Sequence, residues 1–247
     1  MTRKLSPYEK THLHRFGKAD VNIADYGEMP VEYITGQVEF GGQIFTINKN
    51  VLIPRVETEE FVNLALEKIA ENRNQELVIA DVGCGSGAIG INVWKHLPPQ
   101  KAKLYLSDIS EAAIAVTKTN INKLIDEKKN MQLLQSDLLE SYPEGIKFDL
   151  IMANLPYIPS ARVAILEDSV KEYEPHLALD GGEDGLKYIK KMVKQAQDKL
   201  NPGGVILMEV DYTHDETYLN KKLDLGNMTL KTKRDQFERM RFAVITN

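Results

Sequence analysis

Short apolar stretches alternate with segments of helical periodicity from residue 77 onward. Residues 77–80, 104–106, 131–135, 148–153 and 205–210 are the apolar stretches, and each is short enough for a strand. Alternation of this kind joins parallel strands by crossover helices and covers both faces of the sheet. The sequence therefore predicts an α/β protein with a mainly parallel sheet.

The segments that follow these strands predict helices from about Ala88, after Ser110 as a capping residue, and over 187–200. The C-terminal part departs from the alternation. Residues 228–233 and 241–245 read as two strands with only a short polar connection. We expect them to form an antiparallel pair at the edge of the sheet.

The chain is expected to have three parts, 1–30, 31–72 and 73–247. Residues 1–30 predict a short helical segment, because Ser6-Pro7-Tyr8-Glu9 is a capping box with proline at the first helical position. Residues 31–72 predict a β-hairpin with its turn at Gly41-Gly42, followed by a helix from Glu57 to about Asn72. Residues 73–247 form the main domain.

Composition narrows the function classes. The 247 residues suffice for a core without disulfides, and Cys84 is the only cysteine, which excludes an intramolecular disulfide and a cysteine metal cluster. The net charge is −5, which argues against a duplex nucleic acid as the main partner. No long apolar run or signal-peptide core is present. We expect a cytoplasmic protein without a membrane segment, and no metal site.

A glycine loop, Asp81 to Ala88, follows the first of these strands and opens a helix. Gly83, Gly85 and Ala88 fit the pattern G-x-G-x-x-A, and ligands of open α/β sheets bind at the carboxyl ends of the strands. The candidate cofactor-binding residues of this loop are Gly83, Cys84, Gly85, Ser86 and Gly87. The loop alone does not separate a nicotinamide dinucleotide from S-adenosylmethionine.

Two acidic residues follow the next two strands. Asp108 stands where an acidic side chain can accept both ribose hydroxyls of an adenosine ligand. Asp137 follows the third strand and could accept from an adenine amino group, or could simply stabilise a turn.

Asn154-Leu155-Pro156-Tyr157, directly after the fourth strand, distinguishes these classes. The segment suits methylation of a planar nitrogen, which is a poor nucleophile because its lone pair is delocalised. The side-chain oxygen of Asn154 and the carbonyl of Leu155 can accept the two N–H groups of the target and hold the nitrogen in line with a sulfonium methyl. Tyr157 can pack on the flat target group.

The sequence resembles the release-factor glutamine methyltransferases of the HemK or PrmC family, over residues 30 to about 245. The segments that carry the resemblance are Pro30–Gly36, Glu39–Gly41, Val51–Glu59, Asp81–Gly87, Asn154–Ile158 and Glu174–Leu186. Among them, Tyr-Ile-Thr-Gly at 33–36 and Val-Leu-Ile-Pro-Arg at 51–55 are more specific than the glycine loop.

This resemblance implies a seven-stranded, Rossmann-like class I methyltransferase sheet with an antiparallel last strand. It implies transfer of a methyl group from S-adenosylmethionine to the side-chain amide nitrogen (N5) of the glutamine in the Gly-Gly-Gln motif of peptide chain release factors. The site residues that it implies are Gly83 to Gly87 and Asp108 for the donor, Leu138 at adenine, Asn154 for donor and substrate, and Leu155, Pro156 and Tyr157 for the glutamine. Arg55 and Glu57 lie in a family motif without an assigned step.

The chain departs from the family pattern at two places. The motif is usually Asn-Pro-Pro-Tyr, whereas Leu155 replaces the first proline here, so Asn154 loses the restriction that a following proline imposes. The backbone acceptor survives, so we expect a looser but active site. The N-terminal helical segment is also shorter than in the family, which affects the choice of protein substrate.

Four alternatives remain open at this point. Asn-Leu-Pro-Tyr also occurs in ribosomal RNA adenine dimethyltransferases, so RNA or DNA adenine N6 is a second acceptor. A glutamine of a ribosomal protein is a third acceptor. A nicotinamide-dependent oxidoreductase would leave residues 154–157 unexplained, and a donor-binding module without turnover is the last alternative. We expect a monomer that acts on a protein, without direct nucleic-acid binding.

Overall fold

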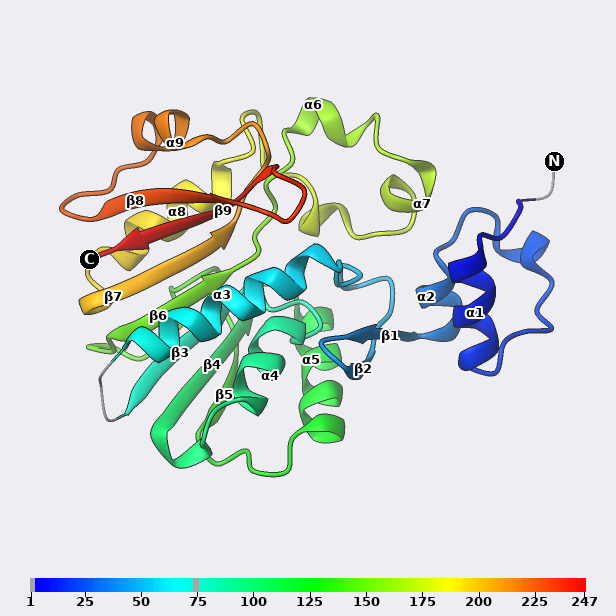
Figure 1. Cartoon of the computed structure of the whole chain (residues 1–247), viewed down its shortest axis with the longest axis horizontal. Coiled ribbons are helices and arrows are strands. Elements are labelled where there is room, and N and C mark those ends of the chain that lie inside the picture. Colours follow the sequence, from blue (N-terminus) through cyan, green and yellow to red (C-terminus); the bar gives the residue numbers. More distant parts are fainter. Residues whose placement is uncertain (1–2, 73–75) are drawn as a thin grey trace.

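The computed structural model describes residues 3–72 and 76–247, and its centre is a seven-stranded sheet (Figure 1). The strands are β3 (Leu77–Val82), β4 (Ala102–Asp108), β5 (Met131–Gln135), β6 (Phe148–Ala153), β7 (Leu200–Glu209), β8 (Thr229–Arg234) and β9 (Met240–Thr246). Their order is β5-β4-β3-β6-β7-β9-β8, and β9 is antiparallel to both of its neighbours. The predicted α/β class, the antiparallel last strand and the C-terminal pair at the sheet edge are confirmed.

Helices cover both faces of the sheet (Figure 1). One apolar cluster joins a face of the sheet to α3 (Glu57–Glu71), α4 (Ala88–Lys95) and α5 (Glu111–Leu124), and the other joins the opposite face to α8 (Lys187–Ala196) and α9 (Glu216–Lys222). Strand β6 shows the period of two: Leu150 and Met152 belong to the first cluster, and Ile151 and Ala153 to the second. Shorter elements are η2 (Pro99–Lys101), α6 (Ser160–Val163), α7 (Asp168–Lys171) and η3 (His176–Ala178).

The N-terminal elements lie beyond the hairpin, at one end of the molecule (Figure 1). They are α1 (Pro7–Arg15), η1 (Ile23–Tyr26) and α2 (Val31–Thr35), and the hairpin itself consists of β1 (Gln37–Phe40) and β2 (Gln43–Thr46). The capping box is present, since Ser6 and Glu9 exchange side-chain to backbone hydrogen bonds. Gly41 and Gly42 have φ values of 56° and 70°, as a tight type I′ hairpin turn requires. Tyr8 donates to Glu32 at 2.7 Å, so contacts between α1 and α2 cross residue 30.

The structure differs from the sequence prediction in several elements. The helix predicted over 187–200 ends at Ala196, and β7 begins at Leu200, because the amide of Phe148 donates to Lys199 O and Leu200 pairs with Phe148. Helices α2 and α9 were not predicted. The expected boundary between residues 72 and 73 adjoins residues 73–75, which lie outside the described residues. Within the described ranges, no helix has the length and hydropathy needed to cross a membrane.

The register of the sheet determines which residues meet at its carboxyl edge. Val82 at the end of β3 pairs with Ser107 of β4 on one side and with Ala153 of β6 on the other. Ala153 in turn pairs with Met208 of β7. The next residues along these strands, Gly83, Asp108, Asn154 and Glu209, therefore lie side by side. The chain leaves β3 toward β4 while β6 lies on its other side, and such a switch point is where open α/β sheets bind ligands.

Candidate active site

The glycine loop bends sharply as it leaves β3. Gly83 has a φ of 72°, and its amide and that of Cys84 both donate to Ser107 O at 2.8 Å. Gly87 has a φ of 79° and caps α4, where a Cβ would approach side chains of Ile91 and Thr117 to 2.9 Å. The loop is thus held against β4 and α5 by contacts that only glycine permits at these two positions. Burial raises the pKa of the Cys84 thiol, which keeps it protonated and poorly nucleophilic.

Asp108 is fixed at the end of β4 by two backbone amides. One carboxylate oxygen accepts from the amide of Gly85 and the other from that of Ser110, each at 2.9 Å. Burial raises the pKa of Asp108, and these amides oppose the rise. Each carboxylate oxygen can accept more than one hydrogen bond, so the group keeps capacity for hydroxyl donors of a ligand.

Asp137 and Leu138 follow β5 at the rim of the same cavity. A carboxylate oxygen of Asp137 pairs with the ammonium of Lys191 at 2.6 Å. Leu138 has a φ of 56°, an uncommon conformation for a branched residue, and its side chain is buried. Both residues line the cavity, and Asp137 also has a structural partner in α8.

Asn154 is oriented by a buried carboxylate. Its side-chain nitrogen donates to Oε2 of Glu209 at 3.1 Å. Because Glu209 offers only acceptors when ionised, the amide must present its NH2 there, and its oxygen lies on the other branch of the carboxamide. Asn154 also lines the cavity, and among the side-chain hydrogen bonds of residues 3–72 and 76–247 none ends on its oxygen, which leaves that oxygen as the candidate acceptor. Among the backbone hydrogen bonds of residues 3–72 and 76–247, none ends on the neighbouring carbonyl of Leu155.

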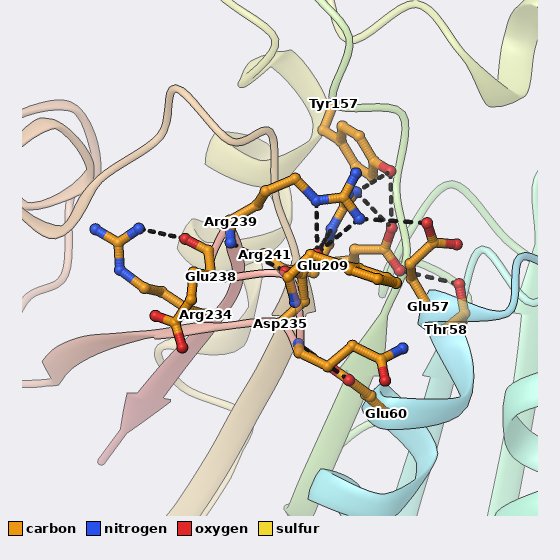
Figure 2. Close-up of polar contacts among 12 residues, drawn as sticks. Glu57, Thr58, Glu60, Tyr157, Glu209, Arg234, Asp235, Glu238, Arg239 and Arg241 are labelled. Atoms are coloured by element: carbon orange, nitrogen blue, oxygen red, sulfur yellow. Dashed lines mark hydrogen bonds and ion pairs between the residues drawn. The ribbon is translucent and has the colours of Figure 1, made fainter.

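Leu155, Pro156 and Tyr157 differ in their relation to the cavity. Leu155 and Pro156 line it, and the Leu155 side chain is buried. Tyr157 does not line it; its hydroxyl donates to Oε1 of Glu209 at 2.7 Å (Figure 2). Burial, followed by the charge of Glu209, raises the pKa of Tyr157, so its phenol stays protonated. Tyr157 can therefore act on the site through Glu209, in addition to the packing on the target group that the sequence predicts.

The cavity at this edge has a volume of about 230 Å³ and is mainly apolar. It brings together most of the residues predicted from the sequence; Gly87 and Tyr157 are not part of its wall. The predicted residues in the wall are Gly83, Cys84, Gly85, Ser86, Asp108, Asp137, Leu138, Asn154, Leu155 and Pro156. Four separate strand ends thus contribute to one site.

A second wall was not predicted as part of the site. It consists of Lys49, Asn50, Val51, Leu52, Pro54 and Arg55, and of Pro175, Leu177 and Ala178. The two segments are joined by an ion pair between Arg55 and the buried Glu174, whose second oxygen accepts from the amide of Ile53 at 3.2 Å. Residues 51–55 and 175–178 lie in motifs that carry the family resemblance. That resemblance was the sequence signal that could have identified this wall. Glu57 of the same motif is paired with Arg239 instead, at 3.3 Å, and does not line the cavity.

The arrangement fits a ligand with an adenosine end and a methyl-bearing end. A fixed carboxylate, Asp108, lies on one side of the glycine loop, and the acceptor Asn154 lies on the other. At Gly83 the loop leaves no room for a side chain, because a Cβ there would lie 2.9 Å from Cδ2 of Leu155. Two oxygens next to such a ligand can bind an NH2 group, which suits transfer to a planar nitrogen.

Comparisons of the sequence with known proteins show which family it is similar to. Residues 60–183 match the methyltransferase small domain family. The release factor glutamine methyltransferase of Leptospira interrogans is 38% identical over 217 residues, covering 88% of this chain and 74% of that protein. The release factor glutamine methyltransferase of Clostridium acetobutylicum is also 38% identical, over 219 residues, covering 88% of this chain and 75% of that protein.

Solved structures agree at the level of the fold. The hMettl16 catalytic domain, in complex with the MAT2A 3′UTR hairpin 6, superimposes with a TM-score of 0.63 at 14% identity, over 82% of this chain and 74% of that one. At this identity the similarity concerns the fold alone. Sequence similarity over most of its length, however, shows that the chain belongs to the release factor glutamine methyltransferase family.

Proposed function

We propose that the chain methylates the side-chain nitrogen of a glutamine in peptide chain release factors, the one in their Gly-Gly-Gln motif, with S-adenosylmethionine as methyl donor. Family membership supports the reaction class. The observation that carries the proposal is the orientation of Asn154, whose NH2 is held by Glu209 while its oxygen remains for the cavity.

The donor, when bound, supplies an electrophilic methyl group on a sulfonium. We assign the adenosine end of the donor to Asp108 and to the wall formed by Leu138. Where the donor passes between the sheet edge and the glycine loop, we expect it to lie against Gly83 and Gly85. Asp137 is assigned to the adenine end of the donor, and its carboxylate also forms an ion pair with Lys191. These assignments follow from where the four strand ends meet.

The glutamine site consists of two oxygens and an apolar wall. Asn154 Oδ1 and Leu155 O each accept one N–H of the amide, which restricts rotation of the nitrogen and favours the pyramidal geometry of the transition state. Pro156 lines the same wall. No side chain has to remove a proton before transfer, because the proton becomes acidic once the nitrogen has been alkylated.

Mass spectrometry tests the proposal directly. A release factor is incubated with the chain and S-adenosylmethionine, digested with trypsin and searched for methylation; one added methyl group on the motif glutamine is expected. Parallel reactions contain ribosomal RNA and ribosomal proteins. Methyl transfer to either of these, with none to the release factor, would contradict the proposed substrate.

A further inference from the structure

Glu209 is the buried carboxylate that accepts from Asn154, and it does not itself line the cavity. It ends β7, and only 2% of its surface is exposed. Thr58 and Asn154 donate to its Oε2, each at 3.1 Å, and Tyr157 donates to its Oε1 at 2.7 Å. Figure 2 shows Thr58, Tyr157 and Arg241 converging on this side chain from three different segments.

Two further charged residues, Arg241 and Asp235, restrain rotation of the Glu209 side chain. The guanidinium of Arg241 lies 3.4 Å from Glu209 Oε1, and its Nε lies 3.6 Å from the fully buried Asp235. Asp235 is paired in turn with Arg239 at 2.9 Å. Oε1 is thus tied to a cation and a phenol, which leaves Oε2 as the acceptor that faces Asn154.

We propose that Glu209 is a positioning residue: its Oε2 holds the NH2 of Asn154 and thereby sets the Asn154 oxygen toward the acceptor nitrogen. The proposal rests on the proposed function for the role of Asn154. A carboxamide rotated by half a turn would present NH2 to the incoming amide, and two donors cannot pair. The hydrogen bond to Glu209 restrains the carboxamide of Asn154, whose backbone lacks the restriction that a following proline would impose.

Glu209→Gln tests this because the charge of Arg241 determines how the new amide lies. The cation attracts the glutamine oxygen, so the glutamine NH2 turns toward Asn154 and Thr58. Asn154 then meets a donor and rotates, and its NH2 faces the substrate. We expect kcat to fall by roughly 100- to 1,000-fold, the range for loss of one positioned transition-state contact, while the Kd for S-adenosylmethionine changes less than about threefold.

The decisive variant exchanges the carboxamide at position 154 with the carboxylate at position 209. Asn154→Asp alone places a second carboxylate against Glu209 and lowers kcat. In Asn154→Asp/Glu209→Gln, the glutamine NH2 donates to one oxygen of the new carboxylate and leaves its other oxygen for the substrate. We expect kcat of the double variant to exceed that of both single variants. Losses that merely add would overturn the proposal, because a purely structural role predicts addition.

Asp149→Asn is the matched control for loss of a buried charge. Asp149 is 4% exposed and lies at the opposite end of the sheet, where it accepts from the amide of Val78 and from Asn201. This variant should lower stability without the kcat loss of Glu209→Gln. If the wild-type chain methylates no release factor, the proposed function fails; if it does so and Glu209→Gln keeps its kcat, only the role of Glu209 fails.

A measurement on the wild-type chain covers the case in which Glu209→Gln does not fold. With ¹⁵N-labelled asparagine, the Asn154 side-chain resonances are assigned by their loss in Asn154→Asp. An NH2 bonded to a buried carboxylate should show slow exchange with solvent and one proton shifted downfield. Rapid exchange with averaged proton shifts would overturn the proposal.

Discussion

A Cβ atom on Gly83 would lie 2.9 Å from Cδ2 of Leu155, so the glycine loop and the segment 154–157 are in direct contact. Leu155 stands where the family resemblance described in the sequence analysis implies a proline. Its buried side chain fills the space beside the loop. The backbone of the donor site and that of the acceptor site therefore constrain each other.

Gly83→Ala should weaken donor binding by roughly 10-fold or more, because the alanine meets Leu155 and also adopts an unfavourable positive φ. Calorimetry with S-adenosylmethionine measures the change. Gly145→Ala is the matched control, since Gly145 has a φ of 74° but no heavy atom near its Cβ position. Both variants should lose stability, and equal Kd values would contradict the prediction.

Asp108→Asn should raise the donor Kd by about 10- to 100-fold, the factor for one charge-assisted hydrogen bond. An asparagine has a single oxygen, so its NH2 must face the amide of Gly85 or of Ser110 and displaces one of them. Asp137→Asn, at a residue already paired with Lys191, should cost less than about tenfold. If titrations gave a larger increase of the donor Kd for Asp137→Asn than for Asp108→Asn, these roles would be refuted.

The main fold follows from sequence because its signals are local. Strands such as Phe148–Ala153 are buried on both faces and read as apolar runs, interrupted in this strand by Asp149 alone. The capping box at Ser6 and the turn at Gly41-Gly42 likewise act over a few residues. The end of α8 at Ala196 could not be predicted this way, because it is set by pairing of Leu200 with a strand about 50 residues earlier.

The candidate site likewise has parts that local sequence patterns predict and parts that they do not. The glycine loop, Asp108 and Asn154 follow predictable strands, so their meeting could be inferred from the geometry of parallel sheets. Glu209 also ends a strand, but its partners come from α3, from the segment that follows β6 and from β9, which no local pattern joins. The second wall at residues 49–55 and 175–178 depends on one long-range ion pair, between Arg55 and Glu174.

Asn154→Ala should abolish methyl transfer while leaving donor binding reduced but measurable. The substitution removes the side-chain acceptor and leaves the Leu155 carbonyl alone to hold the target nitrogen. Asn220→Ala, which removes an exposed asparagine of α9, is the control with full activity expected. Single-turnover transfer at saturating donor measures the loss; undiminished transfer would show that Asn154 does not orient the substrate.

Asp81 offers a test of electrostatics beneath the glycine loop. The side chain is fully buried, and desolvation raises its pKa to about 7 although it accepts from the amide of Gly90 at 2.8 Å. The folded chain thus binds this proton more tightly than the unfolded chain, whose pKa is the ordinary 3.8. The contribution of this group to stability is complete below about pH 4 and is lost as pH rises to about 7.

Asp81→Asn keeps an oxygen for Gly90 and removes the proton equilibrium. The unfolding free energy of the variant, relative to the wild type, should therefore increase between pH 4 and pH 7, by about 1.4 kcal/mol for each unit of pKa difference. Urea denaturation of both proteins across this range measures it. A stability difference that stays constant with pH would mean that the Asp81 carboxylate is ionised in the folded chain at pH 4, against its burial.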